Sequence, residues 1–371
     1  MRPGHFETLK PVCPRCRIER QIYAPLTLAT VIRQDDNNII EGVLHCSDAQ
    51  CQLEYPIIDG IPIVVPYIRK YLSDNYFHII AREDLSETME SLLGDGVGPG
   101  TFLDATRQHL STYTWDHYND LNPDLKSQKS SPEIPLGGSV VNCLEAGLQL
   151  IENNAASAIN PPLIDIGCSV GRTTFELADR YQGLTLGIDV NFSMLRTAQK
   201  VLREGIVQYP LKRIGIVYDR QEFMVSFDNA PFVDFWACDA LALPFTTDSF
   251  GFASGFNVFD SVTSPRDLLE SISQLLKPAG TALIATPYDW SAAATPVETW
   301  VGGHSQRGPD RGAAEPLLKK LLTSGAHPQS IENLALTGEI SHFPWSVRIH
   351  ERSTTLYQTH IVAAQSTKKV S

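Results

Sequence analysis

The sequence has no long hydrophobic run and no excess of positive charge. No apolar stretch approaches the roughly 20 residues that a membrane-spanning helix needs, and residues 1–10 lack the apolar core of a signal peptide. Lysine and arginine number 30 against 42 aspartates and glutamates, a formal net charge of −12. Such a field repels polyanions, so we disfavour nucleic acid as a partner. Because the apolar run and the signal peptide are missing, we expect no membrane partner and a cytoplasmic protein.

Cysteine is scarce and unevenly placed, with four of the seven in the first 51 residues. An odd number is unsuited to a disulfide scaffold and fits a reducing compartment with a metal site. Cys13 and Cys16 form a Cys-x-x-Cys pair, and Cys46 and Cys51 follow as a second pair. Four thiolates can complete a tetrahedral zinc site, with His45 as a substitute for one of them. A redox pair and unrelated buried thiols are the alternatives, and the second pair argues against both.

What the sequence does contain is a repeated strand pattern, strongest at residues 163–172. An apolar run ends in an acidic residue, a turn with Gly167 and Gly171 follows, and a helix opens at residue 173. Glycine permits a tight turn and a close approach to a ligand. In an open α/β sheet, ligands bind beyond the carboxyl ends of the strands. This stretch therefore predicts a ligand site at a βα turn.

Further strands are expected at residues 184–189, 232–240, 252–257 and 280–286, the last after a turn at residues 276–280. The first of these ends in Asp189, about 20 residues after the glycine turn, where a carboxylate can accept hydrogen bonds from ribose hydroxyls. Residues 342–350 and 355–364 are expected to add an antiparallel pair. The order predicts an α/β sheet.

Residues 160–290 resemble a class I S-adenosylmethionine (SAM)-dependent methyltransferase, because five such elements recur in order. The resemblance implies a Rossmann-like seven-stranded sheet with helices on both faces and SAM as cofactor. Ala279 replaces a glycine of the family pattern, and Gly251 stands where an acid is frequent, which weakens the catalytic analogy. A nicotinamide-binding domain, the rival, would need Gly-x-Gly-x-x-Gly, which is missing. The resemblance assigns to SAM the residues Asp165, Gly167, Cys168, Ser169, Gly171, Asp189, Val190, Met194, Asp239, Ala240 and Asn257.

Residues 11–66 resemble the zinc ribbon of a small activator subunit of tRNA and release-factor methyltransferases. A similar ribbon is fused to a bacterial ribosomal RNA guanine methyltransferase. Strands are expected at residues 26–33 and 41–45, with a turn at 35–38. Residues 1–70 hold eight basic and eight acidic side chains, so the segment is no basic nucleic-acid clamp. The resemblance implies a structural zinc and a role in stability, partner binding or substrate presentation.

Aromatic side chains gather in two places that border the expected SAM pocket. Tyr113, Trp115 and Tyr118 belong either to a cap over the pocket or to the packing between ribbon and core. Tyr288 and Trp300 lie in an insertion, about residues 287–330, that is expected to form a substrate lid. Its sequence is similar to the methyltransferase domain of ovothiol synthases, which methylates a thiol-histidine ring nitrogen. The five aromatics are candidate substrate contacts.

The expected division is a zinc ribbon at 1–70, a helical cap and linker at 71–137, and a SAM-dependent methyltransferase domain at 138–371. Asp260 is a candidate base or orienting group, with a solvated loop acid as the alternative. His304 is the second candidate, with an ordinary exposed histidine as the alternative. A small amino-acid-like or natural-product acceptor, methylated on nitrogen, is favoured. An RNA or protein methyltransferase and a non-catalytic SAM-binding partner module are the alternatives. Oligomeric state stays open, a homodimer included.

Overall fold

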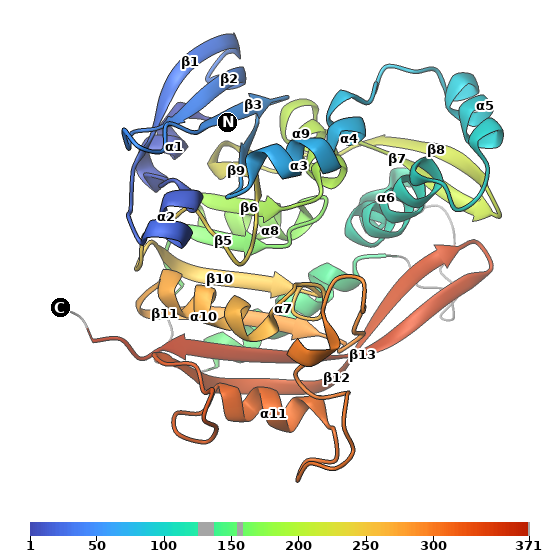
Figure 1. The fold of residues 1–371 in the computed structure, drawn as a ribbon. Coiled ribbons are helices and arrows are strands. Elements are labelled where there is room, and N and C mark those ends of the chain that lie inside the picture. The colour runs from blue at the N-terminus through green and yellow to red at the C-terminus, as the bar shows by residue number, and fades with distance from the viewer. Residues whose placement is uncertain (125–136, 154–158, 370–371) are drawn as a thin grey trace.

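An eleven-stranded sheet runs through the molecule (Figure 1). The computed structural model describes residues 1–124, 137–153 and 159–369. Most of the predicted linker at 122–138 lies outside them. Seven strands form the Rossmann-like part in the order β9-β6-β5-β10-β11-β13-β12, parallel except where β13 joins. They are β5 Leu163–Ile166, β6 Thr185–Asp189, β9 Val233–Cys238, β10 Phe250–Phe256, β11 Leu276–Thr286, β12 Leu334–His350 and β13 Ser353–Ser366.

Burial explains why these strands could be predicted from apolar runs in the sequence. Every residue of β5, β9 and β10 is buried, as expected where helices cover both faces of a parallel sheet. The predicted α/β class and the antiparallel last pair are confirmed. The covering helices are α7 Ser139–Glu152, α8 Arg172–Tyr181, α9 Phe192–Glu204, α10 Pro265–Leu275 and α11 Ala314–Leu321.

One predicted turn is wrong in detail. Residues 276–280 were expected to precede the fifth strand, but β11 begins at Leu276. Its pairing with β10 slips between Phe250 and Phe252, and Ala279 has a left-handed φ of 61°. A register shift of this kind bends a strand without ending it, so the turn lies inside the strand.

The N-terminal strands extend the same sheet instead of forming a separate one. The expected hairpin is present as β1 Leu26–Asp35 and β2 Asn38–Cys46, followed by β3 Glu54–Ile58 and β4 Ile61–Val64. Strand β4 pairs in parallel with β9, through Ile63 with Ala237 and Val64 with Cys238. The pairing covers a sheet edge that would otherwise expose free backbone groups. Helices α1 Pro3–Leu9 and α2 Pro14–Arg20 flank these strands.

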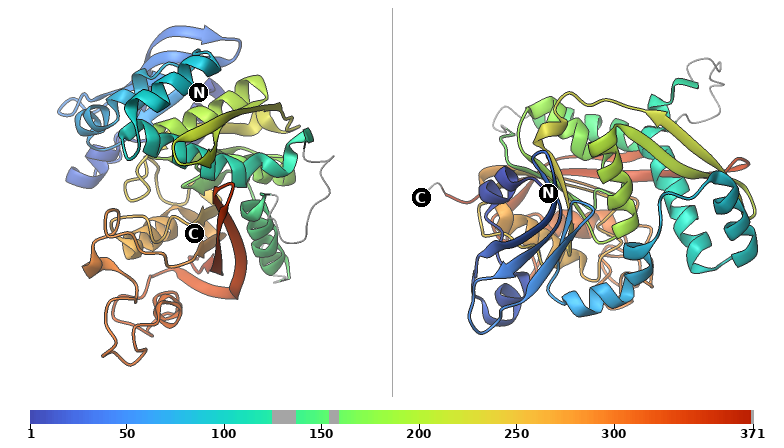
Figure 2. Two further views of the ribbon diagram at one scale, coloured as in Figure 1. Left: turned by 90° about the vertical axis from the view of Figure 1, so that its right-hand side faces the viewer. Right: turned by 90° about the horizontal axis from the view of Figure 1, so that it is seen from above.

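Between the N-terminal unit and the central sheet come four helices, α3 Ile68–Asp74, α4 Tyr76–Ile80, α5 Glu87–Val97 and α6 Phe102–Tyr118. A hairpin of β7 Ile206–Ile214 and β8 Val217–Met224 forms a second, two-stranded sheet. Helix α6 packs against both β7 and β12. Figures 1 and 2 show α5, α6 and the tips of the β7–β8 and β12–β13 hairpins at one end of the molecule.

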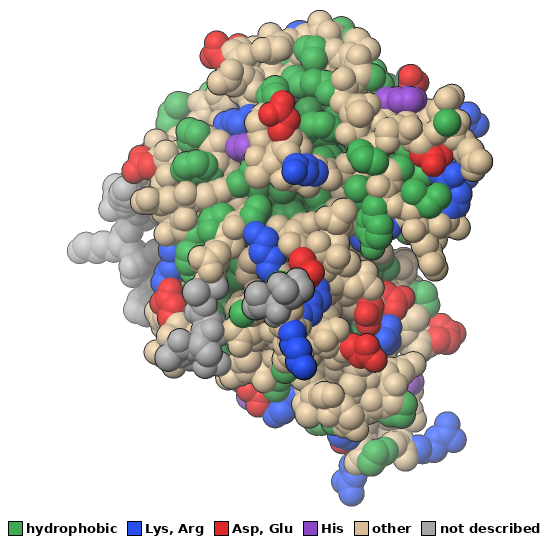
Figure 3. Space-filling model, turned by 90° about the vertical axis from the view of Figure 1, so that its left-hand side faces the viewer, with side chains coloured by type: hydrophobic (Ala, Val, Ile, Leu, Met, Phe, Trp, Pro, Cys, Tyr) green, Lys and Arg blue, Asp and Glu red, His purple; other side chains and the backbone are tan. Residues whose placement is uncertain are grey.

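The outer face of the N-terminal unit carries hydrophobic side chains among charged ones (Figure 3). Ile18, Ile22 and Tyr23 are each more than two-fifths exposed, and Ile32 on β1 is 66% exposed. Scattered apolar side chains are normal on a protein surface. Within the described residues, no helix is both long and apolar enough to cross a membrane.

Candidate functional site

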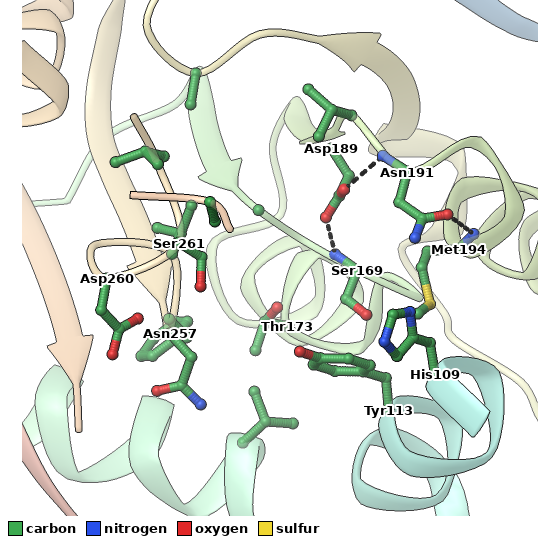
Figure 4. A pocket seen from close by; sticks show the side chains of 18 of the residues that line it. His109, Tyr113, Ser169, Thr173, Asp189, Asn191, Met194, Asn257, Asp260 and Ser261 are labelled. Carbon is green, nitrogen blue, oxygen red and sulfur yellow. Dashed lines mark hydrogen bonds between the residues drawn. The ribbon is translucent and has the colours of Figure 1, made fainter. Parts of the chain in front are cut away.

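A cavity of about 720 Å³ opens at the carboxyl ends of β5, β6, β9 and β10, which is where open α/β sheets bind ligands. Its volume lies in the range of small-molecule sites. Helix α6 and the β12–β13 hairpin supply the opposite wall. Figure 4 shows polar side chains from both walls turned towards the same space.

The glycine turn after β5 forms the floor at one end. Gly167 has a φ of 71°, and a Cβ there would come within 3.0 Å of Val258. Ser169 also has a positive φ, and its buried hydroxyl has no hydrogen-bond partner within the described structure. Both Gly167 and Ser169 line the cavity. A strained turn that leaves a hydroxyl unpaired is suited to receive a polar ligand.

Asp165 supports this turn from behind. Its carboxylate accepts hydrogen bonds from the hydroxyls of Thr173 (2.6 Å), Thr174 (2.8 Å) and Ser254 (2.9 Å). Burial raises the pKa of the carboxyl, and the three donors oppose that shift. Asp165 is 1% exposed and is not among the cavity-lining residues. Its carboxylate therefore holds β5, β10 and the start of α8 together.

Asp189, at the end of β6, joins the turn to the next helix. Its two oxygens accept from the backbone amides of Ser169 (2.9 Å) and Asn191 (2.8 Å). Asn191 caps α9 by accepting from Met194 and the residue before it. Burial raises the pKa of Asp189. The carboxylate lies at the cavity wall (Figure 4), as a ribose-binding acid must.

Asn257 follows β10 at the middle of the cavity. It has a φ of 54°, and its buried side-chain Oδ1 has no partner within the described structure. An unpaired buried acceptor costs free energy unless a ligand satisfies it. Asp239, after β9, accepts from the amide of Leu241 at 2.9 Å. Eight of the eleven residues predicted for SAM line the cavity: Gly167, Ser169, Asp189, Val190, Met194, Asp239, Ala240 and Asn257. Asp165, Cys168 and Gly171 lie behind its wall.

The two candidate bases lie apart. Asp260 lines the cavity and is 2% exposed; its Oδ2 accepts from the Thr286 hydroxyl (3.2 Å) and the Asp289 amide (2.8 Å). Burial raises its pKa. His304 instead lines a separate hollow with Gly303 and neighbouring residues, and its Nδ1 lies 3.1 Å from the carbonyl of Gly302.

Of the five predicted aromatic contacts, Tyr113 lines the cavity. Tyr118 is buried beneath the turn and donates to the carbonyl of Val170 at 2.7 Å. The Tyr288 hydroxyl is hydrogen-bonded to Nδ1 of the buried His360, and Trp300 stacks on Trp290 with ring centroids 5.7 Å apart. Trp115, 6% exposed, is not among the lining residues either.

Apart from Tyr113, sequence reasoning missed the wall that α6 and the ends of β12 and β13 form. Trp345 and Val347 on β12, Tyr357 on β13, and His109 and Asp116 on α6 all line the cavity. Their strands were predicted, but alternation along a strand does not say which face meets a ligand. The aromatic content of residues 113–118 was the signal nearest to Asp116.

Asp116 joins the elements of this wall. Its Oδ1 accepts from the amide of Ser139 at the start of α7 (2.9 Å), and its carboxylate accepts from the Trp345 side chain. Burial raises the pKa of Asp116 to about 7. In the adjacent His117, burial and the charge of Arg172 lower the pKa to about 3, so that ring is neutral near pH 7.

A second group of functional side chains lies in the N-terminal unit. The sulfurs of Cys13, Cys16, Cys46 and Cys51 all lie within 4.8 Å of one another. Cys13 and Cys51 are 3.8 Å apart, and Cys16 and Cys46 are 3.7 Å apart. A tetrahedron with metal–sulfur distances of about 2.3 Å has edges of about 3.8 Å. The four cysteines are therefore placed to hold one metal ion, without His45.

Comparison with known proteins finds a match for the central part of the chain. Residues 164–284 match the family model described as a methyltransferase domain. No curated protein sequence matches the chain.

Three solved structures illustrate the range of structural matches. Phosphoethanolamine N-methyltransferase 2 of Haemonchus contortus is 19% identical with a TM-score of 0.30, over 41% of this chain and 29% of that one. A SAM-dependent methyltransferase of Methanosarcina mazei is 18% identical over 59% and 98%, with a TM-score of 0.37. A complex of the Haloferax volcanii Trm112 methyltransferase activator with a methyltransferase is 16% identical over 62% and 95%, with a TM-score of 0.33. The chain thus spans less than a third of the first structure, and at these scores none bears on substrate.

Proposed function

We propose that the chain is a SAM-dependent methyltransferase that acts on a small, amino-acid-like or natural-product acceptor, with transfer to nitrogen favoured. The observation that carries the proposal is the cavity beside the strained turn. The turn itself lies inside the segment that matches a methyltransferase domain. Among the described residues, the Ser169 hydroxyl and the Asn257 side-chain Oδ1 have no partner, so both can hydrogen-bond to a ligand. A concave cavity of about 720 Å³ has the size of a small-molecule site, which favours a small acceptor.

The chain's own residues divide the work along the cavity. Gly167 and Ser169 would hold the amino-acid end of SAM, Asp189 the ribose, and Asp239 with Ala240 the adenine. When bound, SAM supplies a methyl group on a positively charged sulfur, so the acceptor's lone pair bonds to the methyl carbon while the carbon–sulfur bond breaks and leaves a neutral thioether. Asp260 would orient the acceptor or take its proton. His304 faces another hollow and has no part in this scheme.

The test is SAM binding by titration calorimetry, for the natural chain and for Asp189→Ala. We expect micromolar binding that weakens at least about a hundredfold in the variant, because a ribose contact is lost and the turn is loosened. Asp219→Ala, which removes a half-exposed acid of the β7–β8 hairpin far along the chain from the cavity residues, is the matched control. Circular dichroism checks that both variants fold.

Absence of SAM binding in folded, metal-loaded protein would overturn the proposal. Binding without turnover on any acceptor, including ribosomal RNA, would favour the partner-module alternative. Turnover on RNA or on a protein would overturn the small acceptor while leaving the methyltransferase activity standing.

For the cysteine group we propose structural zinc. The support is the donor set of four thiolates at tetrahedral spacing, a closed arrangement typical of structural sites. The Arg20 guanidinium lies 2.8 Å from the sulfur of Cys16, and the Tyr55 hydroxyl lies 3.1 Å from that of Cys13. Donors of this kind stabilise thiolates. Elemental analysis should give one zinc per chain.

A further inference from the structure

The cavity is acidic, and its walls carry no permanently charged cation. Among the described residues, its lining includes five aspartates, Asp116, Asp189, Asp239, Asp260 and Asp289, and neither lysine nor arginine. The two lining histidines do not reverse this balance. Burial lowers the pKa of both His109 and His117, so their rings are uncharged near pH 7.

Two arginines follow cavity-lining residues or contact them, but neither lines the cavity itself. Arg172, next to His117, binds Asp120 (2.9 Å) and Glu176 (2.6 Å). Arg348 follows the lining residue Val347 on β12, and successive strand residues face opposite sides. It lies instead beside Tyr209 and Glu351. None of these cations reaches into the cavity to meet an anionic ligand.

The acids divide into two groups by position. Asp189 and Asp239 follow β6 and β9 and belong to the end assigned to SAM. Asp260, Asp289 and Tyr357 form the other end, because the Asp289 amide donates to Asp260 and the Tyr357 hydroxyl to Asp289. Asp116 also lines the wall, but burial raises its pKa to about 7, so it is only partly ionised near neutral pH and contributes less charge.

Carboxylates and aromatic rings of the wall are fixed to each other. The hydroxyl of Tyr357 donates to Asp289 at 2.8 Å, and the Trp345 side chain donates to Asp116. A carboxylate attracts a cation directly, and an aromatic face attracts it through the ring quadrupole. Both features therefore select for the same kind of ligand.

We propose that the acceptor binds through a cationic nitrogen, an amine or an imidazole, held among these carboxylates and rings, and that it bears no phosphate. The inference rests on the proposed function and narrows its substrate class. A phosphate or an unpaired carboxylate placed there would meet like charges and no side-chain cation.

The same arrangement prepares the nitrogen for reaction. A protonated amine has no free lone pair, so its nitrogen–hydrogen bond must break before methyl transfer. The Asp260 carboxylate can accept that proton, forming an oxygen–hydrogen bond and leaving the electron pair on nitrogen. Burial, which raises the pKa of Asp260, makes it a stronger base than an exposed aspartate.

Matched probes of opposite charge test the proposal. Histamine is compared with imidazoleacetate, and tyramine with hydroxyphenylacetate, by calorimetry on protein saturated with S-adenosylhomocysteine. We expect each amine to bind at least about tenfold more tightly than its carboxylate partner. Asp289→Asn should reduce that preference to about threefold or less, because the asparagine keeps an acceptor for Tyr357 but loses the charge.

Asp95→Asn is the control, since it makes the same change at an exposed position of α5 and should keep the full preference. If S-adenosylhomocysteine binds but neither amine is preferred, the cationic acceptor is overturned while the proposed function stands. An equal loss of preference in Asp95→Asn would also overturn it, because the effect would then come from overall charge. If S-adenosylhomocysteine does not bind, both proposals fail.

Discussion

At the scale of single residues, the site depends on buried polar groups with divided tasks. Asp165 accepts from three hydroxyl donors behind the wall, whereas the hydroxyl of Ser169 and the side-chain Oδ1 of Asn257 find no partner among the residues that the structure describes. The family resemblance pointed to all three residues but not to this division. Spacing records where a residue lies along the chain, and only the packing shows which polar atoms the protein has already satisfied.

Gly167 offers a test of the turn, with Gly96 as its matched control. Gly167→Ala should lower the free energy of unfolding by about 1–3 kcal/mol and weaken SAM binding, because it places a Cβ at positive φ against Val258. Gly96 lies in α5 with open space around its Cα. Gly96→Ala should leave SAM binding unchanged and stabilise by up to about 1 kcal/mol. Urea unfolding and calorimetry measure both. Equal effects would contradict a strained turn.

Asp116 should make stability depend on pH in a definite direction. Its pKa is about 7 in the folded chain and about 3.9 when unfolded, so between these values the folded state binds the extra proton. Stability contributed by this group therefore falls as pH rises from about 4 to 7, by at most about 1.4 kcal/mol per pH unit.

Asp116→Asn removes this dependence. The asparagine can still accept from Ser139, but its amide opposes the Trp345 donor, so the variant should be less stable at pH 5 and recover relative to the natural chain by pH 8. Urea unfolding of both proteins across that range gives the difference curve. Parallel pH profiles would show that Asp116 does not hold a proton in the folded state. Other buried acids contribute equally to both curves and cancel.

At the scale of elements, the central strands could be predicted because they are buried on both faces of the sheet. Such strands consist of nearly uninterrupted apolar residues. The sequence did not predict that β4 would pair with β9. That contact joins residues about 170 positions apart, and nothing local in Ile63 or Val64 names the partner strand. The part that β12 and β13 play in lining the cavity was not predicted for a similar reason. The cavity forms only where the hairpin, α6 and the rest of the sheet come together.

The N-terminal unit and helix α3, which follows it in the chain, touch the segments at the ends of two ligand-facing strands. Strand β4 pairs with β9 immediately before Asp239, and the hydroxyl of Tyr71 on α3 donates to the carbonyl of Val190 at 2.8 Å. Removing the metal with a chelator should therefore weaken SAM binding about tenfold or more, because the edge strand loses its support. Calorimetry before and after chelation, with zinc measured in each sample, gives the result.

Tyr71→Phe separates the two contacts. It removes one hydrogen bond and keeps the ring, so SAM binding should weaken only about threefold. A zinc-free protein that is folded and binds SAM normally would contradict the coupling between the metal site and the cavity.

At the scale of the whole molecule, one hydrophobic cluster extends from the N-terminal unit into the central sheet. It contains Cys13, Tyr55 and Ile63 together with Trp236 and Leu268. Shared packing of this kind joins segments into one cooperative unit. The expected division into a separate ribbon domain predicts independent unfolding instead.

Differential scanning calorimetry distinguishes the two cases. Metal-loaded protein should show a single transition, with calorimetric and van't Hoff enthalpies that agree. An earlier, separate transition that disappears with chelator would show that residues 1–70 unfold on their own.

The pairing of β4 with β9 also makes the chain divisible. A polypeptide cut after residue 66 would yield a short metal-binding piece whose last strand fits one specific edge, and a longer piece whose edge is left bare. The two pieces would be natural halves of a reconstitution assay. Recovery of activity on mixing would then report how tightly the sheet edge binds a strand that is no longer covalently connected to it.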